Sequence, residues 1–161
     1  MTICTNNREC WLGEIKDGRL IPSAFGEKTR EFWLQIPHHF EHVSLGDFVI
    51  MPNHLHAIVI FPSEGVQLKA PTNLDLENHN YFSKISPHKK TLSIIVRTFK
   101  GVLTNWCRKN GFDYFTWQRN YHEHIIRDEE DWTRIRNYIH DNPQKWQQDI
   151  NHPLLITKNE L

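Results

Sequence analysis

The chain lacks long apolar runs, is poor in cysteine and carries no net formal charge at pH 7. Its three cysteines, Cys4, Cys10 and Cys107, are too few and too widely spaced for a disulfide framework or a cysteine-based zinc site. No apolar leader segment and no apolar stretch of about 18 residues occurs, so the usual signals for secretion and membrane insertion are missing. We therefore expect a cytoplasmic protein with reduced thiols and no membrane partner.

The zero net charge gives no general support for a nucleic-acid partner, but the charges are unevenly distributed. Residues 78–112 contain no aspartate or glutamate, and their cations are Lys84, Lys89, Lys90, Arg97, Lys100, Arg108 and Lys109. A basic segment of this kind is explained equally well by a solvated helix face and by a surface that faces phosphates.

Aromatic residues are plentiful, with nine Phe, six Trp and four Tyr in 161 residues. A chain of this length can bury a sizeable core in one domain. We place that domain at residues 1–146, followed by a C-terminal tail at 147–161. Residues 63–90 are polar and show no hydrophobic period, so we expect a long mobile loop there.

The hydrophobic pattern predicts main strands at residues 2–5, 43–51, 54–61 and 121–126. The strands at 43–51 and 54–61 form a predicted hairpin across Pro52 and Asn53. The pattern also predicts helices at 23–36, 92–106 and 129–142 and a small hairpin at 11–21. Ser23 and Asp128 are the expected N-caps of the first and last helix, and Trp132, Ile135 and Ile139 are the expected buried stripe of the last. The order strand, helix, strand, strand, helix, strand, helix indicates an α+β fold, a ferredoxin-like βαββαβ antiparallel sheet with an extra C-terminal helix. Gly101 lies inside the second helix, where glycine costs about 1 kcal/mol relative to alanine, so we expect another group to pack closely against it.

Two histidines open the strand at 54–61, directly after Pro52 and Asn53. Side chains at i and i+2 of a strand share one face about 6 to 7 Å apart, so His54 and His56 would lie side by side. The rest of this strand is apolar, and an unpartnered imidazole there would cost free energy. The pair is interpreted either as solvated turn histidines or as half of a metal site.

The last predicted helix carries Tyr138 and Asn142, four residues apart and therefore on one helix face. A free phenol has a pKa of about 10 and attacks poorly, but a divalent metal on a scissile phosphate would neutralise charge and ease the attack. Asn142 would offer an amide oxygen as third ligand, which suits Mg²⁺ or Mn²⁺. Tyr138 alone would be an ordinary half-buried helix tyrosine; together with His54 and His56 it indicates phosphoryl transfer by a tyrosine nucleophile.

Three ordered motifs resemble the REP-associated tyrosine transposases, which belong to the single-tyrosine, HUH-type transposases of bacterial insertion sequences. The motifs are Met51-Pro52-Asn53-His54-Leu55-His56, the run from Trp117 to Arg127, and Asn137-Tyr138-Ile139-His140-Asp141-Asn142-Pro143. The similarity extends from about Thr2 to Trp146, which is nearly the whole chain.

The resemblance implies a single-stranded DNA endonuclease and strand transferase that acts near hairpin DNA. His54 and His56 would bind the metal, Tyr138 would form a 5′-phosphotyrosine intermediate, and Asn142 matches the polar third ligand of the family. A bacterial protein of this kind would act in the cytoplasm, associated with the nucleoid, as a monomer or a homodimer.

Candidates for DNA contact and for support of the metal ligands lie in the same motifs and in the basic segment. The DNA candidates are Lys89, Lys90, Arg97, Lys100, Trp117, Gln118 and Arg119. Trp117 and Gln118 would stack on and position a base, although a core role for Trp117 is an equal alternative. His122 and His124 are interpreted as supports for the metal ligands or as core histidines, with the core role favoured for His124.

Two other functions stay open at this point. A histidine-triad nucleotide hydrolase also carries alternating histidines on a strand, but it needs a third histidine where this chain has Ile58. A non-catalytic DNA-binding module with the same fold is the second alternative, although the intact metal and tyrosine motifs argue against it. Tyr121 is a competing nucleophile, and its place on an apolar predicted strand favours a packing role.

Overall fold

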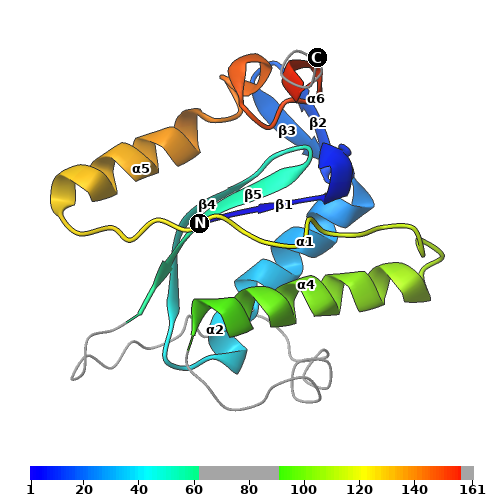
Figure 1. Ribbon diagram of the computed structural model, residues 1–161, viewed down its shortest axis with the longest axis horizontal. Coiled ribbons are helices and arrows are strands. Elements are labelled where there is room, and N and C mark those ends of the chain that lie inside the picture. Colours follow the sequence, from blue (N-terminus) through cyan, green and yellow to red (C-terminus); the bar gives the residue numbers. More distant parts are fainter. Residues whose placement is uncertain (62–90, 157–161) are drawn as a thin grey trace.

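The computed structural model describes residues 1–61 and 91–156; the loop predicted at 63–90 lies outside these residues. A three-stranded antiparallel sheet occupies the centre, in the order β1 (Thr2–Cys4), β5 (His54–Ile60), β4 (Ser44–Ile50) (Figure 1). β4 and β5 form the predicted hairpin around Pro52 and Asn53, and in its register His56 pairs with Val49. The antiparallel α+β fold predicted from the sequence is thus confirmed.

The predicted strand at 121–126 is wrong as a continuous strand. The chain instead runs past β1 and forms two isolated bridges, Thr2 with His122 and Thr5 with Trp117. The Lys100 ammonium takes the carbonyls of Gln118 and Asn120 at 2.7 and 2.8 Å, which removes two acceptors from strand pairing. β1 has only three residues and offers little further edge.

Two helices cover one face of the sheet and enclose the core. Helix α1 (Ala24–Leu34) begins at the predicted N-cap, where the Ser23 hydroxyl accepts from the Gly26 amide, and a short helix α2 (Ile36–His39) follows it. Helix α4 (Leu92–Lys109) packs against α1. Apolar side chains of α1, α4 and the inward-facing Leu55 and Ala57 of β5 belong to one buried cluster.

The expectation about Gly101 is wrong. In residues 1–61 and 91–156, a Cβ placed on Gly101 would meet nothing within 4 Å. Gly101 is only partly buried, so no close neighbour among the described residues requires the absence of a side chain.

The opposite face of the sheet carries helix α5 (Glu129–Asp141), which begins at its predicted cap, where the Asp128 carboxylate accepts from the Asp131 amide. Ile139 is the buried residue of this helix. Trp132 and Ile135, expected to be buried beside it, are only half-buried. Helix α5 therefore lies on the sheet through a narrow apolar contact.

Short elements complete the described chain. The 3₁₀ helix η1 (Asn6–Arg8) follows β1, and the hairpin of β2 (Gly13–Lys16) and β3 (Arg19–Pro22) turns at Asp17 and Gly18 with φ of 51° and 70°, as a two-residue hairpin turn requires. After α5 come η2 (Trp146–Gln148) and α6 (Pro153–Ile156). Among the described helices, none combines the length and the apolar character needed to cross a bilayer.

Candidate active site

His54 and His56 lie side by side on the face of β5 that points away from α1 and α4. Their ring centroids are 4.5 Å apart. His54 is completely buried and His56 is 6% exposed, which rules out the interpretation of the pair as solvated turn histidines. The strand period placed both rings on one face, as predicted.

The tautomer of His54 follows from its neighbour. Its Nδ1 lies 2.8 Å from the amide oxygen of Asn53, and because that oxygen can only accept, Nδ1 carries the proton. The other nitrogen, Nε2, therefore presents a lone pair. In the described part of the chain this Nε2 is buried and has no hydrogen-bond partner, an arrangement that suits a nitrogen able to bind a metal ion.

His56 is held from two sides. Its Nδ1 lies 2.8 Å from the Thr2 hydroxyl on β1, and its Nε2 lies 3.2 Å from the hydroxyl of Tyr138 on α5. The rings of His56 and Tyr138 meet nearly edge to face, with centroids 5.0 Å apart. The structure thus brings together the two sequence motifs that lie 82 residues apart.

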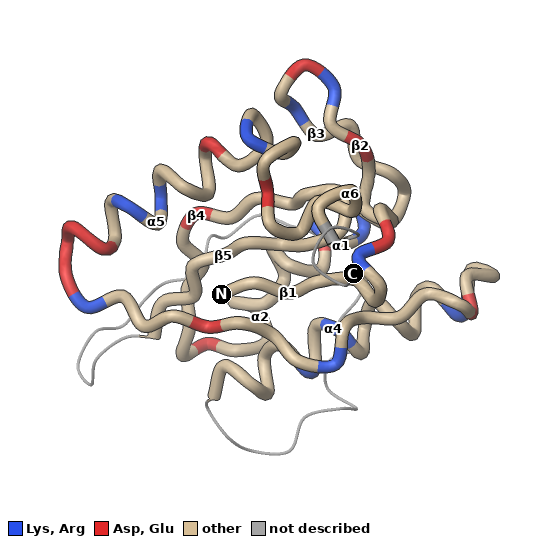
Figure 2. The backbone as a smooth tube through the Cα atoms, turned by 45° about the horizontal axis from the view of Figure 1, so that its top comes forward, with Lys and Arg blue, Asp and Glu red and all other residues tan. Residues whose placement is uncertain are grey.

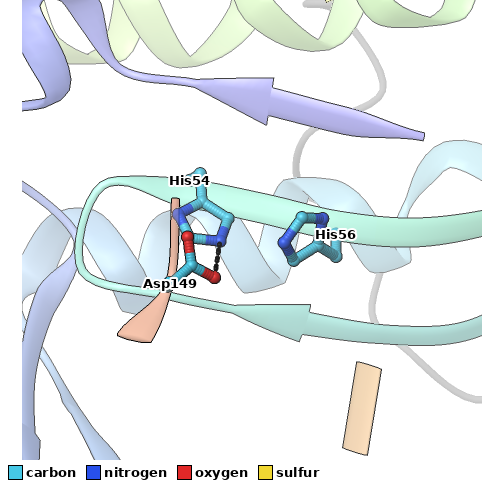
Figure 3. A group of neighbouring side chains, drawn as sticks. All are labelled: His54, His56 and Asp149. Atoms are coloured by element: carbon cyan, nitrogen blue, oxygen red, sulfur yellow. Dashed lines mark ion pairs between the residues drawn. The ribbon is translucent and has the colours of Figure 1, made fainter. Parts of the chain in front are cut away.

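Asp149 completes the group, and the sequence analysis did not identify it. One ligand atom from each of His54, His56 and Asp149 lies within 4.8 Å of the others, and Oδ2 of Asp149 is 3.8 Å from Nε2 of His54 (Figure 3). Asp149 belongs to the segment assigned to a tail, but it is only 7% exposed. The one signal in the sequence is the Asp-x-Asn pattern of a turn, which does not show where the turn will lie.

Burial keeps both imidazoles neutral. Desolvation, and second the positive charge of Arg8, lowers the pKa of His54 to about 3. Desolvation, and second the neighbouring His54, lowers the pKa of His56 to about 3. Metal ions bind the neutral form of imidazole, so protons do not compete for this site near pH 7.

Asn142, the ligand predicted from the sequence, also lies at the site. Asn142 is 3% exposed, and its side chain interacts with Tyr138. Its Oδ1 is buried and has no hydrogen-bond partner among the residues that the structure describes. Asn142 thus lies next to Tyr138, and the cluster of His54, His56 and Asp149 offers two imidazole nitrogens and a carboxylate, a ligand set that fits a divalent cation.

Comparison with known proteins identifies one relative by sequence. No protein-family model matches the chain. An uncharacterised protein of Haemophilus influenzae is 40% identical over 149 residues, which amount to 92% of this chain and 81% of the relative. The chain belongs to the family of this Haemophilus influenzae protein.

A solved structure shows the same fold. It is that of a REP-associated tyrosine transposase bound to a REP hairpin, with a TM-score of 0.59 and 20% sequence identity. The match covers 90% of this chain and 65% of the transposase chain, so the chain spans just under two thirds of that protein's length. At such low identity the likeness establishes a shared fold.

Two of the residues expected to contact DNA, Lys100 and Trp117, instead contact other parts of the fold. Lys100 holds the carbonyls of Gln118 and Asn120, and Trp117 packs on Phe99 and Phe115 at centroid distances of 5.9 and 5.2 Å. The side chains of Arg97, Gln118 and Arg119 are exposed, whereas Lys89 and Lys90 lie outside the described residues. Figure 2 shows Lys and Arg residues on α4, α5 and the β2–β3 hairpin, and Asp and Glu residues on α5, β4 and the same hairpin.

His122 and His124 lie at the surface, and neither contacts the histidine pair through its ring in any hydrogen bond or ion pair of the described chain. His124 pairs with Asp131 at 2.7 Å, so its favoured role as a core histidine is wrong. His122 contributes through its backbone, which bonds with Thr2 in both directions. The side chains that support the two rings are instead Asn53 and Thr2.

Proposed function

We propose that this protein is a metal-dependent single-stranded DNA endonuclease and strand transferase of the HUH type. The observation that carries the proposal is the Tyr138 hydroxyl, which lies 3.2 Å from His56 beside the cluster of His54, His56 and Asp149. A nucleophilic hydroxyl next to a set of metal ligands is what phosphoryl transfer through a covalent enzyme intermediate needs. The fold shared with a tyrosine transposase supports this proposal.

Three side chains would hold a Mg²⁺ or Mn²⁺ ion: Nε2 of His54, Nε2 of His56 and the carboxylate of Asp149. The Asn142 amide oxygen is our candidate for a further ligand, since carboxylate and amide oxygens suit Mg²⁺ and Mn²⁺. A bound cation would neutralise charge on the scissile phosphate. The Tyr138 hydroxyl lies 3.2 Å from Nε2 of His56, so metal binding at this nitrogen requires the phenol to move away from it.

The covalent step exchanges one phosphate ester for another. Tyr138 attacks phosphorus through its phenolic oxygen, its proton passes to water, and an O–P bond forms. The bond between phosphorus and the 3′ oxygen breaks, and that oxygen takes a proton from water and leaves as a 3′-hydroxyl. The segment downstream of the cut stays on Tyr138 through its 5′ phosphate, as a 5′-phosphotyrosine. Because ester replaces ester, another 3′-hydroxyl can reverse the step and join a new strand.

The substrate class in this proposal is single-stranded or hairpin DNA. The structural neighbour is bound to a REP hairpin, and the exposed Gln118, Arg119 and Arg97 remain our candidates for contact with such DNA. We place the protein in the bacterial cytoplasm, where chromosomal DNA is accessible, as a monomer or a homodimer.

Covalent trapping tests the proposal. Labelled single-stranded oligonucleotides taken from the sequence that flanks the gene are incubated with the protein and Mn²⁺, and denaturing electrophoresis separates any adduct. We expect an adduct with the wild type and a loss to background with Tyr138→Phe, because the nucleophilic oxygen is gone. Chelation of the metal should give the same loss.

Tyr121→Phe and Tyr114→Phe are matched controls, since each removes one phenolic oxygen elsewhere. Tyr114 is 67% exposed, and both variants should form the adduct at the wild-type rate. An adduct lost in Tyr121→Phe but kept in Tyr138→Phe would assign the nucleophile to Tyr121. Binding of the oligonucleotide without any adduct would identify a non-catalytic DNA-binding module.

A further inference from the structure

Asn53 lies at the turn between β4 and β5, where the Met51 amide donates to the His54 carbonyl at 2.8 Å. Its side chain is completely buried. It touches three different segments of the chain, which is unusual for a turn residue, since turn side chains mostly face solvent.

The orientation of the Asn53 amide is fixed by its partners. Nδ2 donates to the carbonyls of Arg8 and Asn151, both at 2.8 Å. A flipped amide would place its oxygen against two carbonyl oxygens, which only accept. Oδ1 must therefore face His54, and it accepts the proton of Nδ1 at 2.8 Å.

The bond to Asn151 connects Asn53 with the carboxylate at the site. The backbone N–H of Asn151 donates to Oδ1 of Asp149 at 2.6 Å. The turn that Asn53 holds is therefore the turn that carries Asp149. Arg8 supports the same turn from outside, where its guanidinium donates to the Ile150 carbonyl at 2.7 Å. A single buried amide thus contacts both a histidine and the turn of the acidic residue.

We propose that Asn53 is the positioning residue that couples the two halves of this site. Its oxygen selects the tautomer in which Nε2 of His54 is free to bind metal, and its nitrogen holds the Asp149 turn against β5. This inference deepens the proposed function and rests on it for the metal, but the tautomer and the turn can be measured without metal or DNA.

Nitrogen NMR of the metal-free protein tests whether Asn53 selects the tautomer of His54. We expect Nδ1 of His54 to be protonated and Nε2 to be unprotonated at pH 7 in the wild type. Asn53→Ala should let both tautomers form, because the acceptor is gone. Asn53→Asp should keep the wild-type tautomer, because an oxygen remains in place.

Hydrogen exchange at the backbone amide of Asn151 tests whether the Asn53 side chain holds the Asp149 turn. Both Asn53→Ala and Asn53→Asp remove the donor to the Asn151 carbonyl, so exchange at this amide should become at least tenfold faster in both. Titration with Mn²⁺ should show a 10- to 100-fold weaker Kd for Asn53→Ala, the usual range for a lost support of a metal ligand.

Asn110→Asp is the matched control, because Nδ2 of Asn110 also donates to a backbone carbonyl, that of Trp106, but at an exposed site. It should change neither the tautomer nor the Mn²⁺ affinity. If Asn53 variants do not fold, Arg8→Gln loosens the same turn from its exposed side and should speed exchange at Asn151 while the tautomer stays fixed.

The outcomes separate this inference from the proposed function. A wild-type His54 protonated on Nε2, or Asn53→Ala with a wild-type tautomer and Mn²⁺ affinity, would overturn the role of Asn53. A wild type with the expected tautomer and turn protection that binds no Mn²⁺ would overturn the metal site and leave the role of Asn53 in the fold intact.

Discussion

Tyr138 holds its proton firmly in the described state. Burial, and second the negative charge of Asp149, raises the pKa of its phenol, while the interaction with Asn142 lowers it. The phenolate, which is the better nucleophile, is therefore scarce near neutral pH. The carboxylate that raises this pKa belongs to the candidate metal site, so the same group links metal binding to the reactivity of the phenol.

We predict that Mn²⁺ lowers the pKa of Tyr138. A cation beside Asp149 offsets its negative charge, and the ionised phenol becomes easier to form. Ultraviolet titration of phenolate, taken as the difference between wild type and Tyr138→Phe, should show a downward shift of about one pH unit or more with metal. The rate of adduct formation should rise with pH up to that pKa; a rate that falls as pH rises from 7 would contradict the phenolate mechanism.

At the scale of single residues, short spacings predicted the pairs that the structure brings together. His54 and His56 share a face because a strand repeats every two residues, and Tyr138 and Asn142 are close because a helix repeats every 3.6. Asp149 obeys no such period. It reaches the site because the Asn53 amide and the Arg8 guanidinium hold its turn, and contacts between distant segments leave no local pattern.

At the scale of elements, helix α5 has few means of attachment to the sheet. Ile139 is its buried residue, and one carboxylate of the sheet, paired with two residues of the helix, adds to this apolar contact. The Asp47 carboxylate on β4 accepts from Arg136 at 2.7 Å and lies 2.9 Å from the His140 ring. These two partners come two residues before and two residues after Tyr138, so Asp47 holds the helix turn that carries the phenol.

We predict that Asp47→Ala loosens α5 with little effect on global stability. Exposed ion pairs contribute about 0–1 kcal/mol, so the adduct rate should fall by up to about fivefold while the urea midpoint hardly changes. Hydrogen exchange should accelerate in α5 alone. Glu14→Ala is the control, because it removes an exposed ion pair with Lys16 on the β2–β3 hairpin. Equal adduct rates in both variants would show that Asp47 does not position the helix.

The elements predicted best are those whose signal is local. The capping residues Ser23 and Asp128 marked the starts of α1 and α5, because a side-chain oxygen there accepts from the first free amides. A strand was predicted at 121–126, yet Ile125 within it is 70% exposed. His122 pairs with Thr2, where β1 begins, so residues 124–126 run past the end of β1 and pair with no strand of the described chain; this tertiary context outweighs the local β preference.

At the scale of the whole molecule, the two faces of the sheet differ in what they bury. The face under α1 and α4 encloses an apolar cluster, whereas the other face buries His54, His56, Asn142 and Asp149. Burying polar groups without full hydrogen bonding costs free energy. The site therefore reduces the stability of the metal-free fold, and the apolar face has to compensate for it.

This division predicts that the metal-free protein loses stability as pH falls from about 6.5 towards 4. The pKa of both buried histidines is about 3, against about 6.5 in the unfolded chain. In this window the unfolded state binds more protons than the folded state, so stability declines with falling pH, by up to about 1.4 kcal/mol per pH unit for each histidine.

Urea unfolding with chelator at several pH values measures this slope. His54→Gln should reduce it. A wild type with equal stability at pH 6.5 and 4.5 would show that these imidazoles are not buried as neutral groups.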